Sequence, residues 1–127
     1  MKPTIYLYNL RNETGAKIEA LCAKECISCQ HVTPELYGER IGYVTGIEGF
    51  TATGNVVDCT QLSDEMLLFK NFDQESLTNF LAQYRQAGIK TIPLKAGLTP
   101  TNIHWTSVEL HAELHEEHQA FLNTQKQ

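Results

Sequence analysis

Along this chain, short apolar runs alternate with segments whose apolar residues recur at the spacing of a helix. This alternation limits the fold more than any other feature of the sequence. TIYLYN (4–9) and MLLF (66–69) are nearly continuous apolar runs, as expected for strands buried on both faces. ISCQHV (27–32) and TIPLK (91–95) are weaker strands. Partial alternation in the first and Pro93 in the second favour the edges of a sheet. The sequence therefore predicts a sheet of four strands.

Three segments predict helices. The first begins at Asn12 or Thr14, either of which can cap it, and ends near Glu25. The second begins after Asp73 and ends at Gly88. Its apolar residues at helical spacing are Leu77, Phe80, Leu81 and Tyr84. The third is a histidine-rich helix that closes the chain, so the element order is β-α-β, an irregular crossover, and β-α-β-α.

This order predicts a small single-domain α/β sandwich, in which helices cover a four-stranded sheet that is ordered 2-1-3-4 and mainly parallel. The crossover over residues 33–64 is long enough to carry the chain back across the sheet, so we predict that the first and third strands are parallel. The alternative is a ferredoxin-like α+β sandwich, in which the crossover is an insertion and the third strand is antiparallel to its neighbours. Both architectures place the two most apolar strands at the centre.

The length of 127 residues suits one domain, able to bury roughly two thirds of its unfolded surface without a metal or a disulfide. Within 1–127 we distinguish a first βαβ unit (1–32), a glycine-rich crossover (33–64) and a βαβα half (65–127). The crossover holds five of the eight glycines, and their spacing matches neither G-x-G-x-x-G nor G-x-x-x-x-G-K-[ST]. We expect these glycines to shape turns; the alternative is a mobile flap over a site.

The charge of the chain is unlike that of a typical nucleic-acid binder. The 15 acidic and 10 basic residues give a formal net charge of -5, and no Lys/Arg run appears.

No segment approaches 18 consecutive apolar residues, and MKPTIYLYNLRNETG lacks the apolar core and cleavage site of a signal peptide. We therefore expect a cytoplasmic protein that binds neither nucleic acid nor membrane.

Three cysteines, Cys22, Cys26 and Cys29, spell C-x-x-x-C-x-x-C, the spacing with which radical S-adenosylmethionine enzymes hold an iron-sulfur cluster. Those enzymes place it on a loop of a large barrel, which this chain is too short to form. Cys26 and Cys29 also form a C-x-x-C pair, but redox pairs usually open a helix, whereas this pair closes one. We predict that these three cysteines and Cys59 are free thiols and that no cluster forms.

HWTSVELHAELHEEH (104–118) carries four of the five histidines. On a helix, His104, His111, His115 and His118 fall within roughly 60° of one another. They flank an apolar stripe that consists of Ile103, Leu110, Leu114 and Phe121. The pattern is therefore a row of imidazoles beside a face that packs.

Two interpretations of the row remain open. His111 and His115, at i and i+4, can reach one zinc ion, and His118 or Glu117 could add a third ligand. HAELHEEH is not H-E-x-x-H, so the metalloprotease motif is absent. The simpler interpretation, which the sequence favours, is a pH-responsive surface or interface, against another protein or in a homodimer. It requires no cofactor, and zinc is the alternative.

A second candidate site lies at LKAGLTPTNIHW (94–105). In a parallel sheet the strand ends and the helix N-termini that follow them meet at one edge, where ligands commonly bind. The polar residues expected there are Asn9, Asn71, Lys95, Thr99 and Asn102. Lys95 supplies a cation, and Thr99 or Asn102 with the free N–H groups of the last helix could hold phosphate or a carboxylate. Alternatively, Thr99 or Asn102 caps that helix and Trp105 fills the core.

The run EMLLFKNFDQESLTNFLAQYRQAGIKTIPLKAGLTPTNIHWTSVELHAELHEEH resembles a bacterial family known only as a domain of unknown function, number 3783 in that series. Its members are similar in a strand with an MLxF pattern, an amphipathic helix, and LKAxLTPTNxxW leading into an acidic helix. LYNL and IGYVTGIEGF are similar to upstream segments of longer members. Because the family has no established activity, the resemblance implies element boundaries and no catalytic residues.

The sequence as a whole predicts a small binding or regulatory module that is not catalytic, because no nucleophile and base can be paired by their spacing. The alternative is a small enzyme or ligand-binding protein with an anion site at the loop over residues 95–102. A further alternative is zinc binding by the histidines of the last helix. The predicted partner is a protein or a small anionic ligand.

Overall fold

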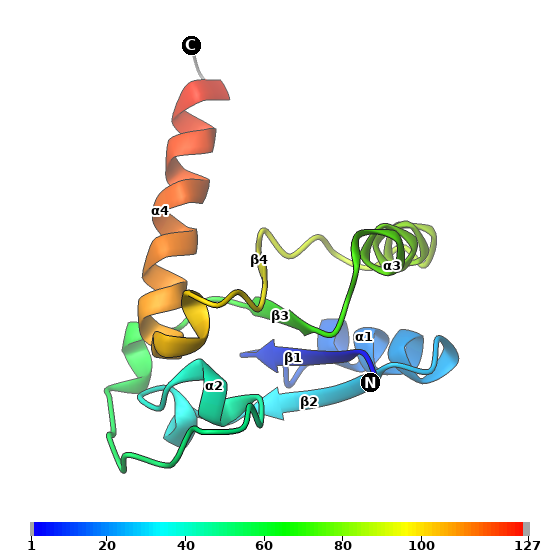
Figure 1. Ribbon diagram of the computed structural model, residues 1–127. Helices are drawn as coiled ribbons and strands as arrows, with labels where there is room; N and C mark the ends of the chain where they lie inside the picture. The colour runs from blue at the N-terminus through cyan, green and yellow to red at the C-terminus, as the bar shows by residue number, and fades with distance from the viewer. Residues whose placement is uncertain (1, 126–127) are drawn as a thin grey trace.

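The computed structural model describes residues 2–125 and shows a four-stranded sheet with helices on both faces (Figure 1). The strands are β1 (Thr4–Tyr8), β2 (Ser28–Val32), β3 (Met66–Lys70) and β4 (Leu94–Gly97). The long helices are α1 (Glu13–Lys24), α3 (Gln74–Gln86) and α4 (Ser107–Gln125). The short ones are α2 (Ile41–Val44), η1 (Pro34–Leu36), η2 (Cys59–Gln61) and η3 (Asn102–His104). The predicted α/β class is confirmed.

The strand order is β2-β1-β3-β4 over the described residues, as predicted, with the two most apolar strands at the centre. β1 pairs with β2 and β3 pairs with β4 in parallel, so the sheet is mainly parallel. β1 and β3, however, are antiparallel, with Ile5 opposite Phe69 and Leu7 opposite Leu67. The prediction that these two strands are parallel is wrong. The ferredoxin-like alternative does not describe the sheet either, because β3 is parallel to β4.

The reason for the reversal lies at the end of β1. Asn9 follows β1 in the left-handed conformation (φ 59°), and its side-chain amide donates to the carbonyl oxygens of Leu62 and Asp64, each at 2.8 Å. The crossover therefore returns to the end of the sheet that it left, and Met66 begins β3 opposite Tyr8. The length of the crossover permits either direction, whereas these hydrogen bonds fix one.

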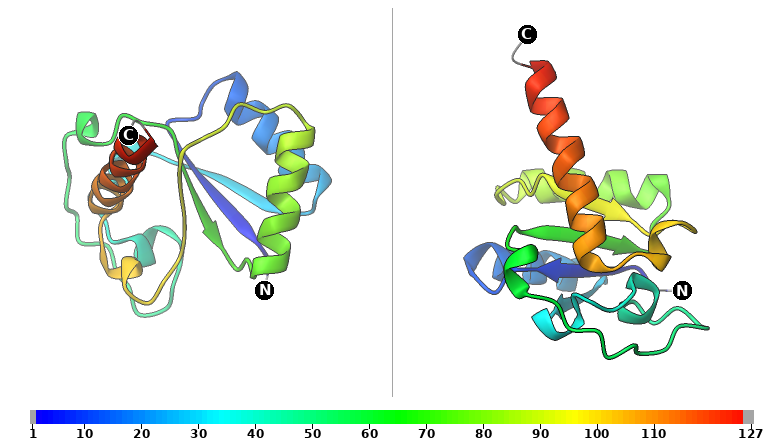
Figure 2. Two further views of the ribbon diagram at one scale, coloured as in Figure 1. Left: turned by 90° about the horizontal axis from the view of Figure 1, so that it is seen from above. Right: turned by 90° about the vertical axis from the view of Figure 1, so that its left-hand side faces the viewer.

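One face of the sheet is covered by α1 and α3 (Figure 2). Asn12 caps α1 by accepting from the Gly15 N–H at 2.9 Å, and Asp73 with Ser76 forms a capping box at the start of α3. Gly88 lies just beyond α3 at φ 71°, where a left-handed residue ends the helix as predicted. The core of this face consists mainly of Ile5, Leu7, Ile18, Leu21, Cys22, Leu67, Phe69, Phe80 and Tyr84.

The opposite face is covered by the crossover and by the first turns of α4. Its core consists of Tyr6, Tyr8, Val32, Tyr37, Ile41, Leu62, Met66, Leu68, Leu94 and Leu110. Two of these tyrosines are bonded through their hydroxyls: Tyr8 lies 2.7 Å from the Ser107 hydroxyl, and Tyr6 donates to the Thr45 carbonyl at 3.3 Å. Because the hydroxyls are buried, losing either bond would leave a polar group without a partner.

Glu39 orders the exposed part of the crossover. Its side chain accepts hydrogen bonds from the Thr53 N–H at 2.7 Å, the Thr53 hydroxyl at 2.8 Å and the Gly54 N–H at 2.9 Å. These bonds, that from the Thr53 N–H first, lower the pKa of Glu39. Gly46, Gly49 and Gly54 all have positive φ values, so the prediction that the glycines shape turns is confirmed there.

Two predicted boundaries near the C-terminus are wrong. β4 begins at Leu94 and not at residue 91, because Pro93 has no N–H to donate to the ladder that starts with Leu94 opposite Met66. α4 begins at Ser107 and excludes His104. Thr106 and Glu109 make a reciprocal capping box there, with N–H to side-chain distances of 2.9 and 3.1 Å.

The C-terminal turns of α4 project away from the sheet (Figures 1 and 2). Leu110 near the start of α4 is 3% exposed, whereas Phe121 is 58% exposed. The predicted apolar stripe therefore packs against the sheet in its first part only. No helix in the described part of the chain, α4 included, is long and apolar enough to cross a membrane.

Candidate metal site at the base of α4

Asp64, His111 and His115 come together where the crossover enters β3. His111 Nε2 lies 2.8 Å from Asp64 Oδ2, and His115 Nδ1 lies 3.8 Å from the same oxygen. The two imidazole rings stack with their centroids 5.9 Å apart. One donor atom from each residue lies within 4.8 Å of the other two, and residues 2–125 contain no other such group of three.

The packing of α4 places the two histidines. They are one helical turn apart, so their side chains leave the same side of the helix. The buried Leu110 and the contact between Tyr8 and Ser107 fix this part of α4 against the sheet. The His111 side chain is 12% exposed and that of His115 is 51% exposed, so the pair spans the boundary between core and solvent.

The hydrogen bonds of Asn9 position the Asp64 carboxylate. The side-chain N–H groups of Asn9 donate to the backbone carbonyls of Leu62 and Asp64, and the side-chain oxygen of Asn9 accepts from the Tyr37 hydroxyl at 3.0 Å. Each of these bonds joins segments that are far apart in the sequence. Asn9, which the sequence suggested as a ligand-binding residue, therefore positions the Asp64 loop in this structure.

Two imidazole nitrogens and one carboxylate oxygen form a donor set that zinc accepts, with a fourth position open to water or to another ligand. Zinc holds such donors at about 2.0–2.2 Å. Since His111 Nε2 and His115 Nδ1 lie 2.8 and 3.8 Å from Asp64 Oδ2, modest side-chain rotations would place all three donors around one ion. Imidazole donors favour zinc and similar transition metals over magnesium or calcium.

A cavity of ≈ 410 Å³ adjoins this cluster, and Glu65, Lys90, His118 and Gln119 help to line it. The Glu65 carboxylate lies 2.9 Å from Lys90 Nζ and accepts from the Asn12 amide at 3.1 Å. Lys90 therefore offsets the charge of Glu65, whereas the Asp64 carboxylate faces the two imidazoles.

The two remaining histidines of the predicted row, His118 and His104, lie at different distances from the cluster. His118 is half-buried on the cavity wall, one turn beyond His115, and is a candidate fourth ligand. His104 lies before α4 and contacts Phe50, with ring centroids 5.3 Å apart, while Arg40 donates to its carbonyl. The row therefore divides at the start of α4.

The structure does not bring the proposed anion-binding residues to one edge. Because β1 is antiparallel to β3, Asn9 lies at the opposite end of the sheet from Asn71, Thr99 and Asn102. Asn71 donates to the Lys2 carbonyl at 3.1 Å. The Thr99 N–H donates to the Asn102 side-chain oxygen, and the Asn102 N–H donates to the Thr99 hydroxyl, each at 2.9 Å. These two hydrogen bonds close a turn before α4.

Lys95 lies on the α3 side of the sheet, apart from that turn. Its position opposite Leu67 puts it on the same face as the α1/α3 core. Its ammonium donates to the Ile92 carbonyl at 2.5 Å, and burial lowers its pKa. Lys95 therefore belongs to a different cavity from the one beside the histidines.

The four cysteines are free thiols in the structure, as predicted, and Cys22 and Cys29 lie beside each other. Cys22 is buried in the α1/α3 core, Cys26 is exposed in the turn after α1, and Cys29 lies in β2. A hydrogen bond between Cys22 and Cys29, together with burial, raises the pKa of Cys22, and the same bond lowers that of Cys29. This pair packs two neighbouring elements together.

Sequence reasoning found His111 and His115 but missed Asp64. The spacing of the histidines on one helix is visible in the sequence, whereas Asp64 lies 47 residues before His111. The one sequence feature that pointed to Asp64 as a ligand is the acidic pair Asp64 and Glu65 directly before an apolar strand. Such a pair is common at strand ends without a metal.

Residues 65–121 match the family model described as Domain of unknown function (DUF3783). The predicted resemblance to a family of this kind is thus confirmed from the start of β3 into α4. The matched range includes His111, His115 and His118 and begins directly after Asp64. No significant match to this chain was found among curated proteins or among solved structures.

Proposed function

We propose that this protein is a small binding module that holds one zinc ion through Asp64, His111 and His115. The observation that carries the proposal is the convergence of three donor atoms within 4.8 Å, from two segments that are remote in sequence. The histidine spacing alone supports two ligands. The Asp64 carboxylate adds a third and brings negative charge beside the imidazoles.

The proposed role of the ion is regulatory and not catalytic. An ion bound to Asp64 and to both histidines would tie the loop before β3 to the base of α4. Because it would bind the folded arrangement and not the unfolded chain, it would stabilise that contact by mass action. The projecting end of α4 would then be held in one orientation toward a partner.

We also propose a cytoplasmic location. The four free cysteines support it, because thiols remain reduced in that compartment. The proposal for zinc does not depend on it.

Calorimetric titration of untagged, chelator-treated protein with zinc tests the proposed function. We expect one equivalent to bind, and we expect Asp64→Asn and His115→Ala each to weaken binding at least tenfold. His115 is 51% exposed, so its replacement leaves the fold intact, which circular dichroism would verify. His104→Gln is the matched control, because His104 lies outside the cluster and should leave zinc affinity unchanged.

Two results would overturn the proposal. The first is the absence of saturable zinc binding by the folded protein. The second is an unchanged affinity in both Asp64→Asn and His115→Ala, which would place the bound zinc elsewhere on the chain. Magnesium and calcium serve as further probes, and neither should compete with zinc at equal concentration.

A further inference from the structure

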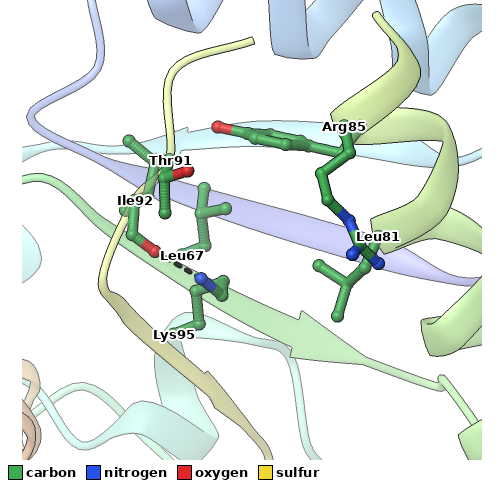
Figure 3. A pocket seen from close by; sticks show the side chains of 7 residues that line it. Leu67, Leu81, Arg85, Thr91, Ile92 and Lys95 are labelled. Atoms are coloured by element: carbon green, nitrogen blue, oxygen red, sulfur yellow. Dashed lines mark hydrogen bonds between the residues drawn. The ribbon is translucent and has the colours of Figure 1, made fainter. Parts of the chain in front are cut away.

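A second cavity lies between α3 and the sheet, on the face opposite the histidine cluster, and it has a volume of ≈ 190 Å³ (Figure 3). Its walls come from β3, from α3, from β4 and from the loop that joins α3 to β4. The lining residues are Leu67, Leu81, Tyr84, Arg85, Thr91, Ile92 and Lys95. The cavity is therefore mostly apolar but carries two cationic side chains.

The two cations approach the cavity from different elements. In Figure 3, Lys95 extends from β4 toward the Ile92 carbonyl and Arg85 extends from α3, so the two cationic side chains line the cavity from different elements. Within residues 2–125, no carboxylate forms an ion pair with either of them. Lys90, in the same loop region, differs because it pairs with Glu65 at 2.9 Å.

The surroundings of Lys95 favour an anion. Its side chain is half-buried against apolar side chains, and its ammonium donates a hydrogen bond to the backbone carbonyl of Ile92. Removing an ammonium from water is costly unless an opposite charge accompanies it. Burial lowers the pKa of Lys95, which reflects that cost. A carboxylate between Lys95 and Arg85 would compensate both charges.

The volume limits the size of the ligand. An apolar cavity of about 150 Å³ admits benzene, so ≈ 190 Å³ is enough for one ring or a short branched chain with a carboxylate. Drug-sized ligands need about 300 Å³ or more. The cavity therefore suits a fragment-sized compound.

We propose that this cavity binds a small carboxylate with an apolar body, which packs against Leu67, Leu81 and Ile92 while its anionic end meets Lys95 and Arg85. This site differs from the anion site that the sequence suggested, because Thr99 and Asn102 take no part in it. It is also independent of zinc binding, which uses the other face of the sheet. Thr91 alone lines both cavities.

Titration with benzoate, followed through backbone amide signals of the ¹⁵N-labelled protein, tests this proposal. We expect saturable shifts centred on Leu81, Arg85, Ile92 and Lys95, with a Kd on the order of 1 mM for a ligand of this size. Benzyl alcohol, which has the same ring without the charge, should bind at least tenfold more weakly. Equal affinity for the two compounds would overturn the proposal, because the cations would then contribute nothing.

Substitutions of the two cationic residues test whether benzoate binds in this cavity. Lys95→Met keeps the apolar stem and should weaken benzoate binding at least tenfold. Arg85→Met should also weaken benzoate binding, although the Arg85 side chain is exposed. Lys90→Met is the matched control and should leave the affinity unchanged. If Arg85→Met and Lys95→Met both bind benzoate as the wild type does, or if no saturable shifts occur, the proposal is wrong.

Discussion

The two faces of the sheet are stabilised in different ways. The face under α1 and α3 is closed by apolar side chains that recur at helical spacing, with an aromatic group in which Phe69, Phe72 and Phe80 meet edge to face. The face under the crossover and α4 also has an apolar core, but single polar side chains fix its irregular segments. Asn9 and Glu39 are the main examples.

This difference explains where the candidate metal site lies. Regular helices on the first face need few long-range polar contacts, so few polar side chains from distant segments meet there. On the second face, hydrogen bonds hold loops against the sheet and bring Asp64 to the histidines of α4. The irregular face therefore carries the group of residues that is suited to a metal.

The largest expected effect is on the regular face. Phe80 is 1% exposed and contacts Phe69, Phe72 and Tyr84. Phe80→Ala should reduce the free energy of unfolding by about 3–5 kcal/mol, since it removes a large buried side chain and leaves a cavity. Urea denaturation at pH 7 measures this loss. A loss below about 1 kcal/mol would show that this face does not depend on apolar packing as described.

Asn9→Ala should have a smaller effect on stability, about 1–3 kcal/mol, because it removes hydrogen bonds at the partly exposed end of β1. It should also weaken zinc binding, although Asn9 is not a ligand, because the Asp64 loop loses its support. Unfolding curves and zinc titration of the same preparation test both parts. Asn71→Ala is the matched control, since Asn71 has a similar left-handed backbone (φ 64°) and lies at the other end of the sheet. Equal zinc affinity in Asn9→Ala and the wild type would break the link between Asn9 and the site.

The ionisation of Glu39 should make the free energy of unfolding depend on pH. Hydrogen bonds lower its pKa in the folded state below the ordinary 4.5, so its stabilising effect is present above that pH. The effect should be lost as the pH falls from about 4.5 through the lowered pKa. Glu39→Gln should therefore be less stable than the wild type at pH 7, and the difference should shrink at pH 3. Urea denaturation at both pH values measures it, and a difference that is constant with pH would contradict the assignment.

The smallest effect is expected at the end of α4. Phe121 is 58% exposed and lies on the projecting turns, so Phe121→Ser should change the free energy of unfolding by less than about 0.5 kcal/mol. Thermal unfolding provides the measurement. A loss comparable to that of Phe80→Ala would mean that the end of α4 packs against an apolar surface in solution.

The sequence could predict those parts of the fold that depend on local pattern. The strands at 4–8 and 66–70, the caps Asn12 and Asp73, and the end of α3 near Gly88 all follow from spacing and capping chemistry. The strand order was also predictable from the apolar character of the strands and from short connections. The start of α4 was predictable in principle, because Thr106 and Glu109 have the spacing of a capping box.

The direction of β3 and the full metal site could not be predicted in this way. Both depend on which residue at the end of β1 bonds to which carbonyl in the crossover. An asparagine after a strand has many partners available, and nothing near Asn9 in the sequence indicates Leu62 or Asp64. The two histidines are encoded locally by their i and i+4 spacing, whereas the carboxylate reaches them only through the fold.

Zinc K-edge absorption spectroscopy of the untagged, zinc-loaded protein tests the central claim most directly, because it identifies the atoms around the ion. The claim predicts nitrogen and oxygen neighbours at about 2.0–2.2 Å, with the outer-shell scattering of two imidazoles in the wild type and of one in His115→Ala. Sulfur neighbours at about 2.3 Å would instead assign the zinc to the cysteines. That result, or a shell of oxygen alone, would contradict a site formed by Asp64, His111 and His115.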